Sequence, residues 1–282
     1  MHKRILCLML CLTMVLPMGS FAFAADDAAV QVADQTQSAT PYFLVEGERY
    51  EDPGMAVYDG IYYVSFVNAV LALRPDAKIG WEGDYAVATA DGLSIKARCG
   101  DQYIQANGRY LYVLHSVKSV DGRLLVPVRT IAQAMGGGVG WIQATGEVEV
   151  YKGTGAIVSG DSFYNSDSVY WLSHIINAES GNQPLDGKLA VGTVIMNRVE
   201  SPRFPNTIYD VIFAPNQFTP TRNGAINKEP NEQSVVAAKL CLEGVRVGGD
   251  ALYFVNPRIS PNSWAARNRP YVMTIGGHAF FG

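Results

Sequence analysis

The sequence predicts an α+β protein with a β-rich first half and a mainly helical second half. Between residues 41 and 152, short stretches of alternating apolar and polar residues are separated by glycine-containing turns, a pattern typical of strands. After residue 166, apolar residues recur three and four positions apart, which predicts amphipathic helices. Residues 153–166 are rich in Gly, Ser and Asp and lack either period, so we place a linker there.

The chain begins with the pattern of a secretory signal peptide over residues 1–24. A positively charged start, HKR, precedes an apolar run, and FAFA offers a cleavage site after Ala24. The large residues before Cys11 do not fit a lipoprotein site, so we expect a secreted or cell-wall-associated protein with no membrane anchor after cleavage. Residues 25–40 are small and polar without a period, and we interpret them as a flexible leader.

Charge and cysteine content argue against several classes of function. Removing Lys3 and Arg4 with the signal changes the formal net charge from −4 to −6, and no Lys/Arg cluster remains to bind nucleic acid. Cys99 and Cys241 form no disulfide framework, and Cys241 lies in an apolar helical stripe typical of a buried residue. No Cys/His cluster has metal-ligand spacing, so we expect neither a metal nor another cofactor.

A repeat in the first half starts at Asp59 and again at Asp121. Each copy reads as an Asp-Gly turn, a strand, a helix and, from a Gly-Trp pair onward, further strands. With a further strand ahead of it, each unit is roughly β-β-α-β-β. We interpret Trp81 and Trp141, the tryptophans of the two pairs, as core aromatics between helix and sheet, and His115 as a structural histidine.

The second copy, GRLLVPVRTIAQAMGGGVGWIQATGEVEVYKG, resembles the stalk modules similar to the N-terminal domain of copper amine oxidases. The first copy is a degenerate version of the same pattern. The resemblance implies a non-catalytic, two-repeat α+β stalk over residues 41–152 that acts as a spacer or contacts the wall. It does not imply copper, because no residue set in the sequence offers a copper site.

The stretch SDSVYWLSHIINAES (residues 166–180) predicts a helix, with capping residues SDS at its start and a stop at Ser-Gly-Asn. Glu179 lies three residues after Ile176 and four after Ile175, so it continues the apolar stripe. A carboxylate on a buried stripe is either paired or has a raised pKa, and a raised pKa suits a general acid for glycosidic bonds. His174 lies on another face and is interpreted as a surface residue.

Two further helices are predicted over residues 186–201 and 231–244, with Asp186 and Asn231 as their N-caps. The pair Asn197-Arg198 is expected to tie the first of them to neighbouring loops. The segment between the helices is rich in prolines, aromatics and amides, and a strand pair surrounds a Gly-Gly turn near the end of the chain. Loops of this chemistry suit a neutral polymer with hydroxyl and amide groups.

Four blocks in this half resemble, in order, the catalytic domain of the spore cortex-lytic and cell wall hydrolase family: AESGNQPLDGKLAVGTVIMNRV, FPNTIYDVIFAPNQFTP, ALYFVNP and TIGGHAFFG. The resemblance covers about residues 167–282. It implies a lysozyme-like, mainly helical fold with a small antiparallel hairpin sheet. It also implies cleavage of peptidoglycan glycan strands, with Glu179 as acid/base and the muramic 6-hydroxyl closing the ring, as in lytic transglycosylases. The family blocks indicate five candidates for substrate binding: Gln217, Phe218, Tyr253, Asn256 and His278.

The sequence departs from the family's commoner AEARGEP form at two positions. Gly181 stands where many members have Arg, and Gln183 where they have a second Glu. A hydrolase with two acids needs them roughly 5–10 Å apart. Asp186 is interpreted as a helix cap and Glu200 as a solvated helix end, so we favour a mechanism with one acid.

These observations predict a secreted enzyme that cleaves the MurNAc–GlcNAc strand of the vegetative wall or the spore cortex. One alternative is an N-acetylmuramoyl-L-alanine amidase, which the lack of a His/Cys/Glu cluster for zinc disfavours. Another is a non-enzymatic wall-binding or spore-coat protein. Peptidoglycan is the expected partner in each case, and no Ser-His-Asp ordering supports a serine hydrolase.

Overall fold

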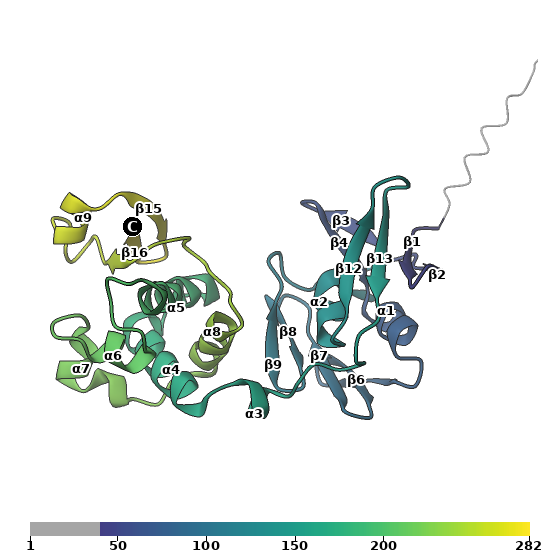
Figure 1. Cartoon of the computed structure of the whole chain (residues 1–282), viewed down its shortest axis with the longest axis horizontal. Helices are drawn as coiled ribbons and strands as arrows, with labels where there is room; N and C mark the ends of the chain where they lie inside the picture. Colours follow the sequence, from purple (N-terminus) through teal and green to yellow (C-terminus); the bar gives the residue numbers. More distant parts are fainter. Residues whose placement is uncertain (1–39) are drawn as a thin grey trace, which may run out of the picture. The chain divides into compact units, whose positions relative to one another are not determined.

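The computed structural model of the protein describes residues 40–282 (Figure 1). The predicted signal peptide (1–24) and all but the last residue of the predicted leader (25–40) lie outside the described residues. Within the described range, no helix is long and apolar enough to cross a membrane. Strands dominate before residue 152 and helices after residue 160, which confirms the predicted α+β class.

Residues 40–152, hereafter the N-terminal region, contain three sheets. The first has the order β12-β13-β1-β2 and contains one parallel pair, β1 with β13; its strands are β1 (Tyr42–Val45), β2 (Glu48–Glu51), β12 (Gly138–Ile142) and β13 (Glu147–Tyr151). The second, β10-β11-β4-β3, is antiparallel and comprises β3 (Ala56–Tyr58), β4 (Ile61–Ser65), β10 (Lys118–Val120) and β11 (Arg123–Pro127). The third is an antiparallel meander of β5 (Lys78–Glu82), β6 (Tyr85–Ala90), β7 (Leu93–Ala97), β8 (Tyr103–Ala106) and β9 (Arg109–Tyr112).

Two helices join these sheets into one core. α1 (Phe66–Leu73) and α2 (Val128–Ala134) each begin directly after a strand, and these strands, β4 and β11, pair with each other. The core includes Phe43, Phe66, Ile95 and Ile131, all essentially buried. Each helix is followed by a strand pair, but β5–β6 lies in the third sheet and β12–β13 in the first. The two segments therefore differ in their sheet partners, and the tandem repeat stays a prediction.

The interpretation of Trp81 and Trp141 as core aromatics is wrong. Their side chains are 65% and 51% exposed. Trp81 lies on β5 and Trp141 on β12, and each of these is the edge strand of its sheet. The core covers these strands only as far as Ile79 and Val139, which precede the tryptophans by two residues on the same face.

Residues 153–282, hereafter the C-terminal region, are mainly helical. The predicted linker contains one short helix, α3 (Gly160–Phe163). The other helices are α4 (Ser166–Ser180), α5 (Leu185–Glu200), α6 (Ile208–Phe213), α7 (Thr219–Asn223), the 3₁₀ helix η1 (Ala225–Asn227), α8 (Glu232–Leu242) and α9 (Trp264–Asn268). Helices α4, α5 and α8 pack against one another around buried aliphatic residues such as Ile176, Val194 and Leu240.

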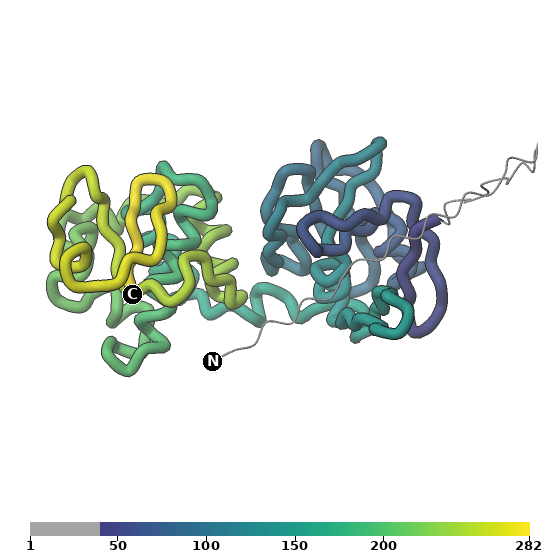
Figure 2. Tube along the Cα trace, turned by 90° about the horizontal axis from the view of Figure 1, so that it is seen from above, coloured from purple at the N-terminus to yellow at the C-terminus, as the bar shows by residue number. Residues whose placement is uncertain are grey.

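A small antiparallel sheet completes the C-terminal region. Its order is β14-β16-β15, with β14 (Tyr253–Val255), β15 (Tyr271–Ile275) and β16 (His278–Phe281). Figure 2 shows β15 and β16 as the yellow hairpin at the end of the chain. The predicted strand pair around the Gly-Gly turn is confirmed.

The helix starts correct two interpretations. α4 is capped by Asn165, whose side chain accepts a hydrogen bond from the Ser168 N–H, rather than by the SDS residues themselves. Asp186 is not an N-cap, because α5 begins at Leu185: the extended residue before the helix is Pro184, which leaves Asp186 within the first turn. The predicted cap at Asn231 is confirmed by its bond from the Ser234 N–H.

Candidate active site

Helix α4 positions Glu179 in its last turn. Leu172, Ile175 and Ile176 on the same helix are fully buried, so the stripe that Glu179 continues faces the core. Glu179 itself is half-buried, and no hydrogen bond or ion pair to its side chain is found among residues 40–282. Burial raises the pKa of Glu179 above its ordinary value. The carboxyl group therefore keeps its proton to a higher pH than a solvated glutamate does.

The turn between α4 and α5 is held by a buried lysine. Lys188 is 1% exposed, and its Nζ donates to the carbonyl oxygens of Gly181 at 2.9 Å and Gln183 at 2.5 Å. Burial lowers the pKa of Lys188. A cation paired with Glu179 would lower the pKa of that carboxyl group. Because Lys188 binds carbonyl groups instead, it fixes the turn that follows Glu179 without removing the acid's proton.

Gln183 connects this turn to the β15–β16 hairpin. Its Oε1 accepts a hydrogen bond from the Gly277 N–H at 3.0 Å. Gly276 in the same hairpin has φ +55°, and a Cβ there would lie 1.9 Å from Gln183 Oε1. The hairpin can therefore approach the turn this closely only because position 276 is glycine. His278, one of the predicted site residues, follows directly.

Arg198, near the other end of α5, also fixes neighbouring loops through hydrogen bonds. It is 5% exposed, and its Nε donates to the Leu252 carbonyl at 2.8 Å while Nη1 donates to Gln217 Oε1 at 3.0 Å. Burial lowers the pKa of Arg198 to about 10. Its neighbour Asn197 donates to the carbonyls of Gly249 and Ala251, at 2.8 and 2.9 Å. The prediction that Asn197-Arg198 ties this helix to neighbouring loops is confirmed.

Several predicted site residues gather around Arg198. Gln217 binds its guanidinium directly, and the guanidinium carbon lies 5.4 Å from the ring centroid of Phe218 and 5.5 Å from that of Tyr253. Cation–π contacts of this kind hold aromatic side chains in fixed positions. Phe218 is 4% exposed, so it supports the site from beneath, whereas Gln217 is exposed and Tyr253 is half-buried.

His278 joins this group through Phe254, and Asn256 does not. The Phe254 ring lies 5.3 Å from that of His278 and 6.3 Å from that of Phe218. His278 is 8% exposed, its Nδ1 has no hydrogen-bond partner within residues 40–282, and burial lowers its pKa, which favours the neutral imidazole. The Asn256 side chain accepts a bond from the Arg258 N–H, a local contact at the end of β14.

Sequence reasoning missed Lys188, although its spacing carried a signal. Lys188, Val191, Ile195 and Arg198 recur three, four and three residues apart, so one face of α5 is apolar in the middle and cationic at both ends. The two cations are separated by about 15 Å of helix axis. A lysine on an apolar stripe must place its ammonium group among acceptors. Here those acceptors are the carbonyls of the turn after Glu179.

The interpretation of His174 as a surface residue is wrong. It is 4% exposed, and its Nδ1 lies 2.7 Å from the Ile226 carbonyl oxygen. The 3₁₀ helix η1 packs on α4 and covers the face that local periodicity assigned to solvent.

The other carboxylates considered for a second acid have partners elsewhere. Asp186 Oδ1 accepts a bond from Gln102 Nε2 at 3.1 Å, and Glu200 Oε1 lies 2.5 Å from Arg246 Nη2. In the part of the chain that the structure describes, no three or more His, Cys, Asp or Glu side chains gather to hold a metal ion. Among residues 40–282, Glu179 is thus the carboxylate with a raised pKa and no donor beside it.

Residues 182–281 match the protein family described as Cell Wall Hydrolase. The C-terminal region belongs to the cell wall hydrolase family. The match covers α5, the Gln217 loop and the hairpin, and it begins three residues after Glu179. Residues 44–153 match the family described as Copper amine oxidase N-terminal domain, the resemblance predicted for the N-terminal region.

Curated relatives of this cell wall hydrolase domain include two spore cortex-lytic enzymes. The chain is 37% identical over 117 residues to that of Bacillus cereus and 33% identical over 117 residues to that of Bacillus subtilis. These alignments cover 42% of this chain and 45% and 38% of the relatives, so the chain spans less than half the length of either.

Two solved structures are also similar to this chain. The catalytic domain of the germination-specific lytic transglycosylase SleB from Bacillus anthracis is 35% identical with a TM-score of 0.40, covering 45% of this chain and 100% of that chain. The catalytic domain of the Bacillus cereus SleB protein is 36% identical with a TM-score of 0.40, covering 42% of this chain and 92% of that chain.

Proposed function

We propose that the C-terminal region cleaves the MurNAc–GlcNAc glycan strand of peptidoglycan, with Glu179 as its single acid/base. The observation that carries this proposal is a half-buried glutamate at a helix end, with a raised pKa and neither a cation nor a donor beside it among residues 40–282. Membership of the cell wall hydrolase family supports the substrate class. The names of the relatives favour spore cortex lysis in germination as the setting.

The mechanism requires Glu179 to act first as an acid and then as a base. Protonated Glu179 donates its proton to the bridging oxygen, and the bond to the anomeric carbon breaks with positive charge developing on the sugar ring. The carboxylate so formed then takes the proton of the muramic 6-hydroxyl, whose oxygen bonds to the anomeric carbon. The product is a 1,6-anhydro ring, and the proton returns to Glu179. The partners of Asp186 and Glu200 support a path that uses no second acid.

Within this proposal, Gln217, Tyr253 and Asn256 contact the glycan, while the buried Phe218 and His278 support them. The C-terminal region adopts a lysozyme-like arrangement over residues 167–282. Residues 41–152 form a two-repeat stalk, 153–166 a linker, and 1–24 a signal peptide for export to the wall.

The test is Glu179→Gln, which keeps the side-chain volume and removes the proton that the mechanism transfers. We expect the variant to release muropeptides from purified sacculi at no more than about one thousandth of the wild-type rate. Its far-UV circular dichroism spectrum should be unchanged. Glu200→Gln is the matched control and should keep near-normal activity. A Glu179→Gln protein that clears sacculi at nearly the wild-type rate would contradict the assignment.

Mass spectrometry of the wild-type products separates the possible reactions. Anhydro-muramyl ends support the lytic reaction, and reducing muramic ends indicate hydrolysis with water. Free stem peptides indicate an amidase. Binding to sacculi without any soluble product, at any pH, would identify a non-enzymatic wall protein.

A further inference from the structure

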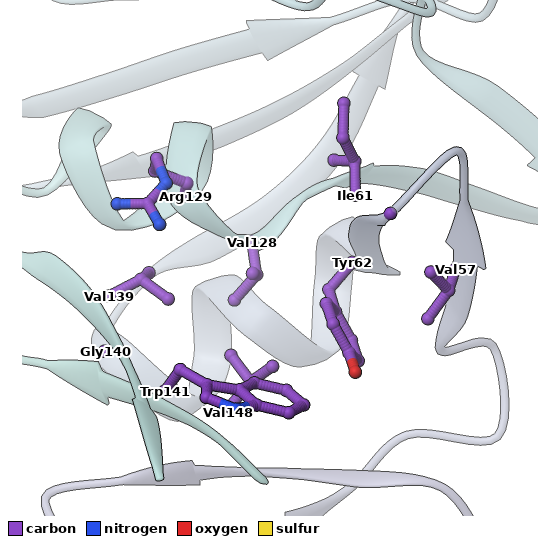
Figure 3. A pocket seen from close by; sticks show the side chains of 10 residues that line it. Val57, Ile61, Tyr62, Val128, Arg129, Val139, Gly140, Trp141 and Val148 are labelled. Atoms are coloured by element: carbon purple, nitrogen blue, oxygen red, sulfur yellow. The ribbon is translucent and has the colours of Figure 1, made fainter. Parts of the chain in front are cut away.

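A cavity of about 550 Å³ opens on the N-terminal region beside Trp141 (Figure 3). Trp141 is 51% exposed, and its ring lies 5.4 Å from that of Tyr62 at an interplanar angle of 47°. Arg129, at the start of α2, lines another side, with Val128 and Val139 between it and the aromatic pair. Arg129 is exposed and has no ion pair or hydrogen bond from its side chain within residues 40–282. The cavity thus joins an aromatic face, an aliphatic floor and an unpaired cation.

A second, smaller cavity of about 220 Å³ lies beside Trp81, which is 65% exposed. It is lined by the start of α1, by β5 with Trp81, and by β11 with Arg123. The cavity at Trp141 is lined by the start of α2 and by β12 with Trp141, both from the second predicted repeat copy, and by β4 with Tyr62 from the first. In the cavity at Trp81 the two copies have the opposite roles. Each cavity therefore takes a helix start and a tryptophan from one copy and a strand from the other. Each cavity thus holds one exposed tryptophan and one exposed arginine, although the arginine lies on the helix beside Trp141 (Arg129) and on the strand beside Trp81 (Arg123).

The chemistry of these surfaces selects an amphipathic, partly anionic ligand. A large exposed aromatic ring on an edge strand exposes apolar area to water, at a free-energy cost that a ligand's apolar face can offset. Sugar rings present such faces of C–H groups, and their hydroxyl and amide groups stay solvated at the rim. The unpaired guanidinium adds a fork that matches a carboxylate. A protein of formal net charge −4 gains no general attraction for an anionic polymer, so a local cation is needed to bind one.

We infer that the Trp141 cavity, with the Trp81 cavity as its counterpart, binds peptidoglycan glycan: a sugar ring stacks on the indole and a carboxylate of the polymer pairs with Arg129. This inference rests on the proposed function for its choice of polymer. The carboxylate comes from a stem peptide, or from the muramic lactyl group where no stem peptide is attached, because the attached peptide converts the lactyl carboxyl group to an amide. Two weak sites on one chain bind a repeating polymer more tightly than either alone, because the second contact forms at high effective concentration. The N-terminal region thereby holds the cell wall hydrolase domain on its insoluble substrate.

The experiment measures binding of the full chain to purified sacculi in a Glu179→Gln background, so that its result does not depend on cleavage. We expect Trp141→Ala to weaken binding about tenfold, and Trp81→Ala combined with Trp141→Ala to weaken it more than either change alone. Leu114→Ala is the control, because Leu114 is 54% exposed in the same region and lines neither cavity. Its binding should stay within twofold of the parent protein.

Arg129→Gln gives a second test that does not alter the aromatic surface. It should weaken binding to sacculi several-fold yet leave binding to chitotetraose, which has no carboxylate, unchanged. Amidase treatment removes the stem peptides and frees a lactyl carboxylate in their place, so loss of the Arg129 effect on treated sacculi shows that Arg129 requires the peptide carboxylate, and its persistence shows that a lactyl carboxylate is bound as well.

Binding of the two tryptophan variants within twofold of the parent would overturn the inference, whether or not Glu179 proves catalytic. A parent that sediments as a dimer, becomes monomeric with Trp141→Ala and binds sacculi unchanged would also overturn it, because the cavity would then join two copies of the chain. Trp141→Phe, which keeps an aromatic ring, should restore part of the binding lost in Trp141→Ala.

Discussion

Two carboxylates removed from solvent, Asp52 in the N-terminal region and Glu179 in the C-terminal region, have opposite surroundings. Asp52, in the N-terminal region, is fully buried and accepts hydrogen bonds from the N–H groups of Gly54 and Ser65, the Ser65 hydroxyl and the Asn68 amide. Glu179, in the C-terminal region, is half-buried and has no donor beside it among the described residues. Four hydrogen bonds satisfy the oxygens of Asp52, whereas burial without donors favours the protonated form of Glu179. Asp52 therefore connects the backbone and side chains around it, whereas Glu179 is suited to carry a proton.

The cations of the C-terminal region follow the same logic. Lys188 and Arg198 are both buried, and both donate to backbone or amide oxygens rather than to a carboxylate. A buried cation beside Glu179 would have lowered the pKa of that group. Since the two cations bind the surrounding loops instead, the site gains fixed loops and keeps a protonated acid.

The largest effect is expected where donors would lose their acceptor. Asp52→Asn replaces an acceptor with an amide donor that faces the donors of Ser65 and Asn68, so it should lower the free energy of unfolding by about 3–4 kcal/mol. Glu179→Gln, the matched change in the other half, should alter it by less than about 0.5 kcal/mol at pH 5. Urea unfolding followed by circular dichroism measures both. Equal costs for the two variants would remove the distinction between them.

A smaller effect is expected from Lys188→Met, which keeps an apolar chain of similar length. The Gln183 carbonyl loses the lysine donor, while the Gly181 carbonyl still accepts a bond from Asn231 Nδ2 at 3.0 Å. We expect a loss of about 1–2 kcal/mol in unfolding free energy. The rate of muropeptide release should fall about tenfold, because the turn after Glu179 loosens. Lys228→Met, at an exposed lysine, serves as control, and an unchanged release rate in Lys188→Met would show that the turn needs no such support.

These features differ in how far the sequence predicts them. The inward position of Glu179, the cap at Asn231 and the final hairpin follow from periodicity and turn chemistry within a few residues, and the structure bears out each of these local assignments. The interpretation of Trp81 and Trp141 as core aromatics is wrong because the exposure of a strand residue depends on whether another strand pairs beyond that strand. That is decided by distant pairings, and both strands prove to be edges.

Coverage by distant segments explains the other misses. His174 is buried because residue 226, 52 positions away, lies over its helix face. The role of Lys188 does not follow from the sequence because the carbonyl groups that accept its hydrogen bonds belong to a turn whose geometry depends on how α4 and α5 pack. The local sequence pattern therefore predicts which face of a helix is buried. It does not predict which distant groups contact the polar residues of that helix.

The next prediction concerns pH and tests the donor-free environment of Glu179. Its pKa in the folded protein lies above the ordinary value of 4.5, so the folded state binds more protons than the unfolded state between the two pKa values. The contribution of protonated Glu179 to the free energy of unfolding is fully present below pH 4.5 and is lost as the pH rises through the pKa of Glu179 in the folded protein. Glu179→Gln lacks this loss, so its stability relative to wild type should increase from pH 4.5 upward and then level off. Urea midpoints across pH 4–8 measure the difference, and a gap that is constant or shrinks with pH contradicts the assignment.

The smallest effect is expected at Gln183, the position at which the family resemblance leads us to expect a second glutamate. Gln183→Glu keeps the oxygen that accepts the Gly277 N–H and loses only the long 3.3 Å bond from Nε2 to Asn182. Muropeptide release should therefore stay within about threefold of wild type, whereas Gln183→Leu, which removes the acceptor, should slow it more by freeing the hairpin. A tenfold or greater gain in Gln183→Glu, with reducing rather than anhydro ends among the products, would show that a second carboxylate serves the chemistry. In that case residue 183 would be part of the catalytic pair, and its role would extend beyond joining the Glu179 turn to the hairpin.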